Sequence, residues 1–562
     1  MEQLFKIIPQ EYRKKGLKVA LLVPFKAVIE LVGVAALIPM LLLVLNKEAF
    51  VGSFLEKIYD FAGFTDSFSF ATAVSISIVI ILIIKSIISL WIVNYQNNYL
   101  LSLYGYFSGR LFSNLYNKGL LFIKSSNSSE LTYNISAVCY SFVVSYLSGI
   151  MHLAGEFIFA VLMLTGLMLY SVKAALLSFA AFVPVILIYL IAVRKPLSRY
   201  GRLENKAKRK QYKLINETFR GYAEVEVNDA FPLIRERFSE GLKDIASYRV
   251  KSSLMQTIPS YLVEIVVVVV VVGMLIFGID ANNPANVMFI GVFSVALLRL
   301  LPTVKSIISS WSAIKATKYT RDVVSQIDDA CGYKYSYKYS PDSEIIFSDA
   351  IRASELSFSF PSGEVLHYPP FKIKKGERYG IKGRTGVGKT TLFNLLLGLY
   401  FPENGIIEID GVPLTGENVE QWHKIVGYVP QDVFISDASV AENVALGYEP
   451  CNIDRERVQS VLEQVSLKSF TDSLPDGIDT VIGENGNRVS GGQRQRIGIA
   501  RALYKRAQVL FFDEATSSLD SQTENEVNQA LESLSIQKKE LTIIVISHRE
   551  STLAFCDNIL EI

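Results

Sequence analysis

The chain has 562 residues, of which 50% are apolar and 20% are charged, and its mean hydropathy of +0.31 is typical of a membrane protein. The formal net charge of +2 is far below the basic excess with which nucleic-acid-binding proteins bind phosphates, so this class of protein is excluded. The four cysteines are too few and too scattered for a disulfide framework, so we expect reduced thiols.

Six apolar runs before residue 315 are each long enough to cross a bilayer, which takes about 20 helical residues. They lie near residues 18–45, 70–96, 137–170, 172–193, 254–279 and 286–312. The first run is too long for the core of a signal peptide and lacks an obvious cleavage site, so we expect it to remain in the mature protein. A six-helix transmembrane domain is therefore predicted over residues 1–325.

Positive charges between the runs predict the orientation in the membrane. The segments before the first run, between the second and third, and between the fourth and fifth are rich in Lys and Arg. By the positive-inside rule these segments are cytoplasmic, as is everything after the sixth run. The segment between the fourth and fifth runs has few helix breakers, so we expect the helices to continue into the cytoplasm, with bends near residues 122–131 and 221–229.

The external segment after the first run has an apolar stripe. Phe50, Phe54, Ile58 and Phe61 share one helical face, with charged and hydroxyl residues opposite. The pattern predicts an amphipathic helix at about residues 48–62, which either lies on the outer membrane surface or caps its own transmembrane helices.

A polar linker over residues 326–342 leads to a second domain, residues 343–562, which begins with a phosphate-binding motif. GRTGVGKT follows an apolar strand-like stretch and opens a helix, which is the context that a P-loop requires. Its backbone N–H groups would hold phosphate oxygens, Lys389 would reach the β- and γ-phosphates, and the Thr390 hydroxyl would ligate Mg²⁺. The expected ATP-binding residues here are Gly383, Arg384, Thr385, Gly386, Val387, Gly388, Lys389, Thr390 and Thr391.

A second motif predicts the hydrolytic chemistry. VLFFDE, residues 509–514, is a buried-strand pattern that ends in two carboxylates. Asp513 would hold the magnesium shell, and Glu514 would polarise the attacking water. Together with the P-loop, this motif predicts an ATPase that uses Mg²⁺.

Between these motifs lies VSGGQRQRIGIARAL, residues 489–503, and here the sequence resembles the ATP-binding cassette (ABC) family, whose signature is LSGGQ. The resemblance covers the whole chain and implies a type I exporter fold, an α-helical six-span domain followed by an α/β P-loop nucleotide-binding domain. It also implies contacts from the signature to the nucleotide held by the opposite subunit. The residues concerned are Ser490, Gly491, Gly492 and Gln493.

The same resemblance implies roles for further residues. Gln431 in YVPQD is similar to the glutamine that senses Mg²⁺ and the membrane domain, and His548 in VISHRE is similar to the histidine that contacts the γ-phosphate. Phe360 stands where the family stacks an aromatic ring on adenine. SSLD, residues 517–520, resembles the D-loop, and Glu484 in IGENG resembles the acidic loop that couples the cassette to the membrane domain.

One membrane domain and one cassette make half a transporter, so we expect a two-fold symmetric homodimer with two sites that hydrolyse ATP. Closure of the cassettes around nucleotide would drive alternating access. The expected location is the inner membrane, with the cassette in the cytoplasm.

Two cations lie deep in the predicted membrane domain. Lys85 is about 15 residues into the second run and Arg299 about 12 into the sixth, so both lie roughly 20 Å from the external surface. Charges at this depth face a cavity or a partner. The two cations would therefore form an anion site in a substrate cavity, or pair with the acids of other runs. The candidate acids are Glu30, Glu156 and Glu264.

The external helix and the deep cations together resemble the PglK-type flippases of lipid-linked oligosaccharides. Local stretches such as IELVGVAALIPML and ALLRLLPTVKSI carry the likeness. It implies ATP-driven transfer of a polyprenyl-pyrophosphate-linked glycan to the periplasmic leaflet, with Lys85 and Arg299 at the pyrophosphate. The fifth run departs from that family, with Ser260 and Tyr261 near the place of an arginine. The alternatives are an exporter of another amphipathic lipid, a drug or a peptide, and a membrane-anchored ATPase that transports nothing.

Overall fold

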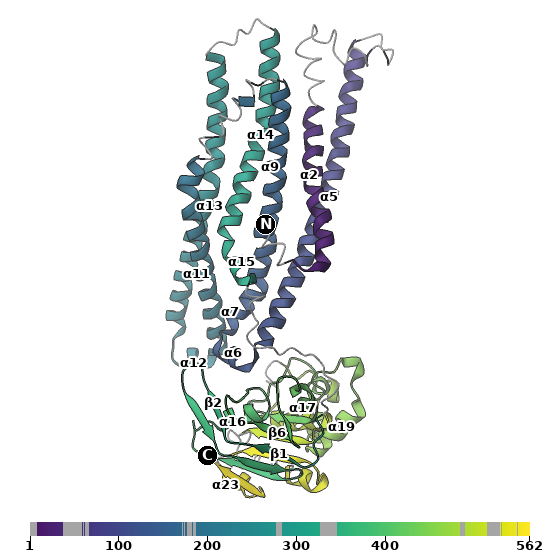
Figure 1. The fold of residues 1–562 in the computed structure, drawn as a ribbon, viewed down its shortest axis with the longest axis vertical. Helices are drawn as coiled ribbons and strands as arrows, with labels where there is room; N and C mark the ends of the chain where they lie inside the picture. The colour runs from purple at the N-terminus through teal and green to yellow at the C-terminus, as the bar shows by residue number, and fades with distance from the viewer. Residues whose placement is uncertain are drawn as a thin grey trace. The chain divides into compact units, whose positions relative to one another are not determined.

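The structure, a computed structural model, describes residues 8–36, 59, 61, 67–170, 172, 175–176, 183, 187–276, 284–325, 345–483, 489–513, 529, 531–547 and 549–562. The chain divides into two compact units (Figure 1). One comprises Met1–Lys118 and Phe122–Gly332, and the other Gly119–Leu121 and Tyr333–Ile562. The predicted linker at residues 326–342 lies outside the described residues, as does almost all of the predicted external helix at residues 48–62.

The first unit is helical wherever the structure describes it. Its longer helices overlap the predicted apolar runs, and several of them extend past the ends of those runs. In chain order the elements are α2 (Gln10–Ala35), α5 (Ser67–Asn117), α6 (Gly119–Ser125, whose first three residues belong to the second unit), α7 (Ser128–Tyr133), η2 (Asn134–Val138), α8 (Cys139–Ser141), η3 (Phe142–Leu147), α9 (Ser148–Tyr170), η4 (Tyr189–Val193), α11 (Arg194–Arg220), α12 (Tyr222–Val227), α13 (Phe231–Ile276), α14 (Pro284–Ala316) and α15 (Lys318–Ser325).

Over their described residues, five of the six predicted runs fall on these helices; residues 37–45 of the first run, 277–279 of the fifth and most of the fourth lie outside the described part of the chain. In the part of the chain that the structure describes, two stretches are long and apolar enough to cross a membrane by length and composition, Ser69–Asn117 and Ser128–Leu169. Helices α11 and α13 continue far beyond the apolar residues, as predicted from the lack of helix breakers.

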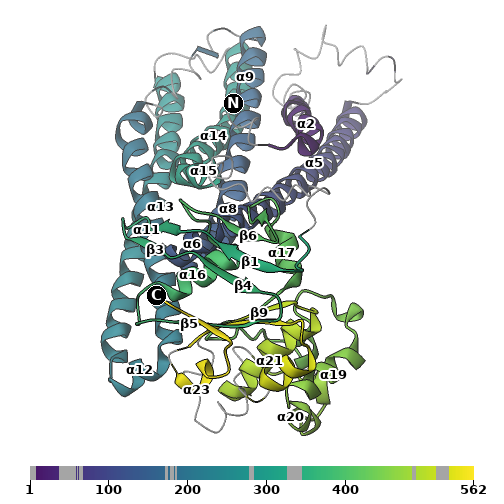
Figure 2. The ribbon, with the colours of Figure 1, turned by 60° about the horizontal axis from the view of Figure 1, so that its bottom comes forward.

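Both predicted bends are confirmed. Asn127 caps α7 by accepting a hydrogen bond from the Ser129 N–H at 3.0 Å, in the Ser- and Asn-rich segment between α6 and α7. At the other bend, the short helix α12 lies between Gly221 and Asn228, and Asp229 adopts a φ of +48°. The chain reverses there, so that α11 and α13 pack along each other (Figures 1 and 2).

The helices that contribute to the predicted substrate cavity are in contact. Helix α2 packs against α5 and α9, and α9 packs against α14. Buried side chains of α2, α9 and α14 form one core, which includes Phe159 and Met163 of α9 and Phe293 and Leu300 of α14, whereas buried residues of α5 belong to another core. Packing of these four helices positions the deep charged residues described below.

The second unit is an α/β domain built on a parallel sheet. The five strands lie in the order β11 (Asn558–Glu561), β5 (Arg378–Lys382), β10 (Thr542–Ile546), β9 (Val509–Asp513) and β8 (Val426–Val429). Strands β9 and β10 are buried at every residue, because helices cover both faces of a parallel sheet. An antiparallel sheet contains β4 (Phe371–Lys374), β1 (Ala350–Ala353), β6 (Ile407–Ile409) and β7 (Val412–Pro413), and β2 (Leu356–Ser359) pairs with β3 (Val365–Tyr368).

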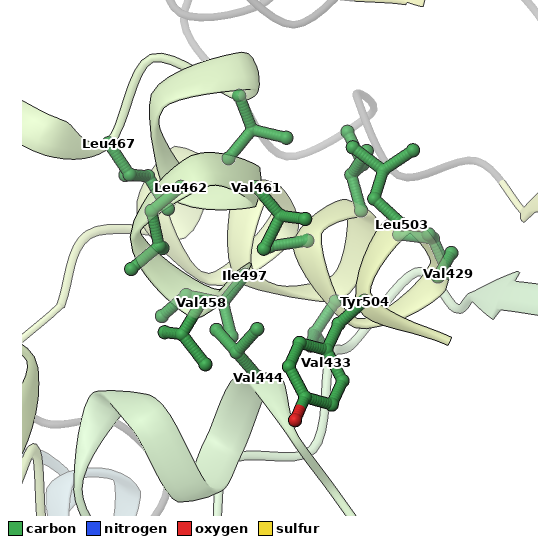
Figure 3. Packing of buried hydrophobic residues seen from close by; sticks show 14 of the residues in the cluster. Val429, Val433, Val444, Val458, Val461, Leu462, Leu467, Ile497, Leu503 and Tyr504 are labelled. Carbon is green, nitrogen blue, oxygen red and sulfur yellow. The ribbon is translucent and has the colours of Figure 1, made fainter. Parts of the chain in front are cut away.

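Two hydrophobic cores stabilise this unit. One includes Leu392 and Phe393 of α16 (Lys389–Leu396) together with residues of both larger sheets. The other includes residues of β8, β9 and β10 together with α19 (Arg455–Gln464), which packs against α21 (Gly491–Tyr504). Figure 3 shows side chains of this core, among them Val461 of α19 and Leu503 of α21. The other described helices here are α17 (Val419–Ile425), α18 (Val440–Val444), α20 (Lys468–Asp472) and α23 (Glu550–Leu553).

Candidate nucleotide site and membrane cavity

Neighbouring parallel strands bring the predicted nucleotide-binding residues to one edge of the sheet. The P-loop follows β5, Asp513 ends β9, and Gln431 comes two residues after β8. Strand β10 lies between β5 and β9, and its Ile546 is in register with both Ile381 and Asp513. Since the carboxyl ends of parallel strands meet at this edge, the arrangement is that of a ligand site in an open α/β sheet.

The P-loop has the backbone geometry that phosphate binding requires. Gly386 and Gly388 adopt φ angles of +85° and +100°, a region that favours glycine, and α16 begins directly after them. A Cβ atom on Gly388 would approach the Tyr368 Oη and the Leu366 Cδ1 to 2.7 Å. The Lys389 Nζ donates to the carbonyl oxygens of Gly383 at 2.9 Å and Arg384 at 3.1 Å. Loop and lysine therefore fit the phosphates of ATP at a helix N-terminus.

Side-chain exposure divides the loop residues into two groups. Arg384, Thr385, Val387 and Thr390 are exposed, so the Thr390 hydroxyl is accessible to a metal ion. Lys389 and Thr391, which the sequence predicts to bind ATP, are buried, and the Lys389 Nζ contacts carbonyl oxygens of the loop itself.

Tyr368 supports the P-loop, and the sequence motifs did not identify it. The side chain is 1% exposed, and its Oη donates to the Gly388 carbonyl oxygen at 2.8 Å. Burial raises the pKa of Tyr368, so the phenol remains a donor at neutral pH. Its position at the end of β3 is the only signal in the sequence.

The carboxylate predicted to hold Mg²⁺ is buried at the sheet edge. Asp513 is 6% exposed, and its Oδ2 accepts a hydrogen bond from the Tyr428 Oη at 3.5 Å. Burial and the Asp513 carboxylate raise the pKa of Tyr428. The Asp513 carboxylate and the exposed Thr390 hydroxyl are oxygen ligands of the kind that Mg²⁺ takes, so the residues present fit this ion. Tyr428 was also missed, although it lies only three residues before Gln431.

The structure describes the remaining predicted residues only in part. Gln431 is exposed on the loop after β8, and Phe360 is half-buried with its ring edge-on to Phe358 at 5.1 Å. Glu514, His548, the D-loop at residues 517–520 and Glu484 lie outside the described residues.

The signature residues form the start of α21. The Ser490 Oγ accepts a hydrogen bond from the Gln493 N–H, and the Gln493 Oε1 accepts one from the Ser490 N–H at 2.8 Å. This capping box fixes the helix N-terminus at Gly491 and Gly492. Helix α21 packs in one hydrophobic core and α16 in the other, so signature and P-loop belong to different parts of the unit.

A polar cavity of about 310 Å³ lies within the first unit. Ionisable groups from four helices line it, and the cations outnumber the carboxylates. These residues are Lys26, Glu30, Lys85, His152, Glu156 and Arg299. Both cations that the sequence identified by depth therefore lie at one cavity.

Glu30 pairs with both predicted cations. Its Oε2 lies 2.6 Å from the Lys85 Nζ and also forms an ion pair with the Arg299 Nη2. The Arg299 guanidinium stacks over the Phe159 ring at 5.1 Å, while its Nε has no hydrogen-bond partner among the described residues. Of the other candidate acids, Glu264 pairs with Lys305, and Glu156 lines the same cavity. Lys85 and Arg299 therefore both pair with an acid and line the cavity, so the two alternatives from the sequence apply at the same time.

Comparisons with known proteins agree with this geometry. The sequence profile of the ABC transporter family matches residues 366–517. The ATP-dependent lipid A-core flippase of Burkholderia orbicola (strain AU 1054) is 30% identical over 481 residues, which cover 83% of this chain and 78% of that protein. That of Francisella tularensis subsp. holarctica (strain OSU18) is 34% identical over 352 residues, 61% of this chain and 56% of that protein.

A solved structure has a similar fold. It is a bacterial Atm1-family ABC exporter with ATP bound, with a TM-score of 0.77 and 20% sequence identity. The match covers 98% of this chain and 93% of that one, so the similarity includes the helical part and the α/β part.

Proposed function

Since this chain belongs to the ABC transporter family and has the exporter fold, we propose that two copies of it form an ATP-driven flippase for an anionic amphipathic lipid. The chain couples ATP hydrolysis to transport. The specific cargo that we propose is a polyprenyl-pyrophosphate-linked oligosaccharide, moved from the cytoplasmic to the periplasmic leaflet of the inner membrane. The nucleotide-binding unit would then lie in the cytoplasm.

The observation that carries this proposal is the charge of the membrane cavity. Lys26 of α2, Lys85 of α5 and Arg299 of α14 converge there, against the carboxylates of Glu30 and Glu156. A buried phosphate loses its hydration, and nearby cations offset that cost. The polar cavity would take the head group, while the hydrocarbon tail can stay in lipid. The names of the relatives, which are lipid flippases, support a lipid cargo.

The proposed mechanism assigns each nucleotide-site residue a task. The P-loop from Gly383 to Thr391 binds the phosphates, and Phe360 stacks on the adenine. Thr390, Gln431 and Asp513 would hold Mg²⁺, which neutralises charge on the phosphates when bound. Glu514 polarises the attacking water and His548 contacts the γ-phosphate. The signature at the start of α21 completes the site of the second subunit, so nucleotide binding joins the two cassettes.

Flipping of a labelled polyprenyl-pyrophosphate glycan in proteoliposomes tests the proposal. Lys85→Ala and Arg299→Ala should each lower the flipping rate at limiting lipid about tenfold or more, because each removes a charge-assisted hydrogen bond to phosphate. The control is Lys305→Ala, which removes a cation that pairs with Glu264 and is not among the cavity-lining residues. Normal flipping by both cavity variants would contradict an anion site.

One observation favours a second candidate, an exporter of another lipid, a drug or a peptide. Glu30 pairs with both Lys85 and Arg299 and offsets part of their charge, so a cargo with little negative charge can also enter the cavity. For a neutral or cationic cargo, removal of the two cations should preserve or improve transport. A membrane-anchored ATPase without transport would show no ATP-dependent movement of any labelled lipid.

A further inference from the structure

We propose that the Glu30 carboxylate holds the anion position of the membrane cavity until a lipid head group displaces it, and that this competition selects head groups with two phosphate groups over those with one. The inference rests on the proposed function, because it concerns the same cavity. It assigns Glu30 a role in cargo specificity in addition to charge balance.

The first support is the geometry of the ion pairs. A single oxygen, Oε2 of Glu30, contacts Lys85 on one helix and Arg299 on another. A phosphate oxygen that bridges two cations would make the same contacts. The side chains of Glu30 and Lys85 are each 20% exposed and that of Arg299 is 36% exposed, so a ligand in the cavity can reach all three.

The two cations are positioned by contacts that do not involve Glu30. Gly33 leaves room for the lysine, since a Cβ atom there would lie 3.1 Å from the Lys85 Cδ and 3.6 Å from its Nζ. Phe159 supports the Arg299 guanidinium from one side. When the carboxylate leaves, Arg299 therefore keeps its contact with Phe159, and Lys85 keeps the room beside Gly33.

A second partner for the displaced carboxylate lies one helical turn away. Lys26 precedes Glu30 by four residues on α2, so their side chains share a face of the helix. Lys26 lines the cavity and makes no salt bridge with any residue that the structure describes. Rotation of the Glu30 side chain toward Lys26 exchanges one ion pair for another, and the carboxylate is not left unpaired in the membrane.

The charge of the head group then decides whether displacement is favourable. A monophosphate places one anionic group at Lys85 and Arg299, where it replaces the carboxylate and gains little. A diphosphate brings a second anionic group into a cavity where the cations outnumber the carboxylates. Specificity would thus come from an internal competitor that only the more highly charged ligand displaces.

Equilibrium binding of two probes to the full-length protein in nanodiscs tests the inference. The probes are radiolabelled polyprenyl monophosphate and polyprenyl diphosphate, compared for wild type, Glu30→Gln and Glu30→Asp. We expect Glu30→Gln to bind the monophosphate about tenfold more tightly, with a smaller gain for the diphosphate, so that the preference for diphosphate shrinks. Glu30→Asp keeps the charge but shortens its reach. Its preference for diphosphate should lie between those of wild type and Glu30→Gln.

Glu264→Gln is the matched control, because it removes a carboxylate from another ion pair of the same unit, with Lys305. It should bind both probes as wild type does. An unchanged preference in both Glu30 variants, or weaker binding of both probes by Glu30→Gln, would overturn the role of Glu30 and leave the proposed function intact. If wild type binds neither probe and flips no anionic lipid, the proposed function itself fails, and this inference with it.

Discussion

Tyr368 fixes the P-loop through one buried hydrogen bond to the Gly388 carbonyl oxygen. Gly388 directly precedes Lys389, the first residue of α16. Backbone N–H groups at the start of a helix have no partner within it, and here they face the phosphate site. At the scale of single residues, the loop therefore depends on a side chain from a different sheet as well as on its own glycines.

The first prediction concerns this contact. Tyr368→Phe should raise the KM for ATP about three- to tenfold with little change in kcat, because the loop loses a hydrogen bond worth about 1 kcal/mol. Tyr504→Phe is the control, since Tyr504 is equally buried and its hydroxyl accepts from the Asp454 N–H, away from the loop. Steady-state ATPase kinetics measure the effect. If Tyr504→Phe raised the KM as much, loss of general stability would explain both results.

An ion pair ties two strands of the parallel sheet together at their beginnings. The Arg378 backbone N–H donates to the Asp557 Oδ2 at 2.9 Å, and its Nη2 donates to the Oδ1 at 2.6 Å. Arg378 begins β5, which leads to the P-loop, and Asp557 directly precedes β11. At the scale of elements, this contact fixes the edge strand β11 against the strand that carries the nucleotide site.

The second prediction is the pH dependence of this contact. The hydrogen bonds and charge of Arg378 lower the pKa of Asp557. When folding lowers the pKa of a carboxyl group, that group stabilises the fold at pH values above its ordinary pKa of about 3.9. This stability is lost as the pH falls through the pKa of the folded state. Asp557→Asn should therefore lower the thermal midpoint at pH 7, with a loss of unfolding free energy of no more than about 1 kcal/mol for a partly exposed pair.

Thermal unfolding of the full-length protein at several pH values checks this prediction. The difference between wild type and Asp557→Asn should shrink below about pH 4. Glu540→Gln serves as the control, because that side chain is 87% exposed and its removal should change the midpoint little. A difference that grew toward low pH would contradict the assigned cause.

The whole molecule is proposed to work as a homodimer with two composite ATP sites. Each site would take its P-loop from one copy and its signature from the other, and in one chain these belong to different hydrophobic cores. Activity should then depend on both copies at once.

The third prediction uses Glu514 to test this dependence. Glu514→Gln should bind ATP but hydrolyse it about 100-fold or more slowly, because a general base contributes 10²- to 10⁴-fold to the rate. Near-normal ATPase would contradict the role of Glu514.

When wild type and variant are mixed before reconstitution, the rate should fall with the square of the wild-type fraction if both sites of a dimer must act. A linear fall would contradict coupled sites, and Glu532→Gln mixed in the same way is the control.

The sequence alone was sufficient for the exporter fold, which the comparisons confirm, and it predicts the residues of a nucleotide site. Apolar runs of about 20 residues and the short spacings around Lys389 and Asp513 have local physical causes, so they can be recognised without a structure. The bends at α7 and α12 were predicted for the same reason, because turn residues act on their own backbone.

Only the tertiary structure decided which partners the deep charges take. Glu30 and Arg299 are 269 residues apart, and three acids were equally plausible from depth alone. Tyr368 reaches Gly388 from a strand of another sheet, and neither residue type signals the contact. Such pairs depend on how helices and strands pack, and packing is set by many distant side chains together. Depth and spacing follow from the order of residues along the chain, but contacts across the fold do not.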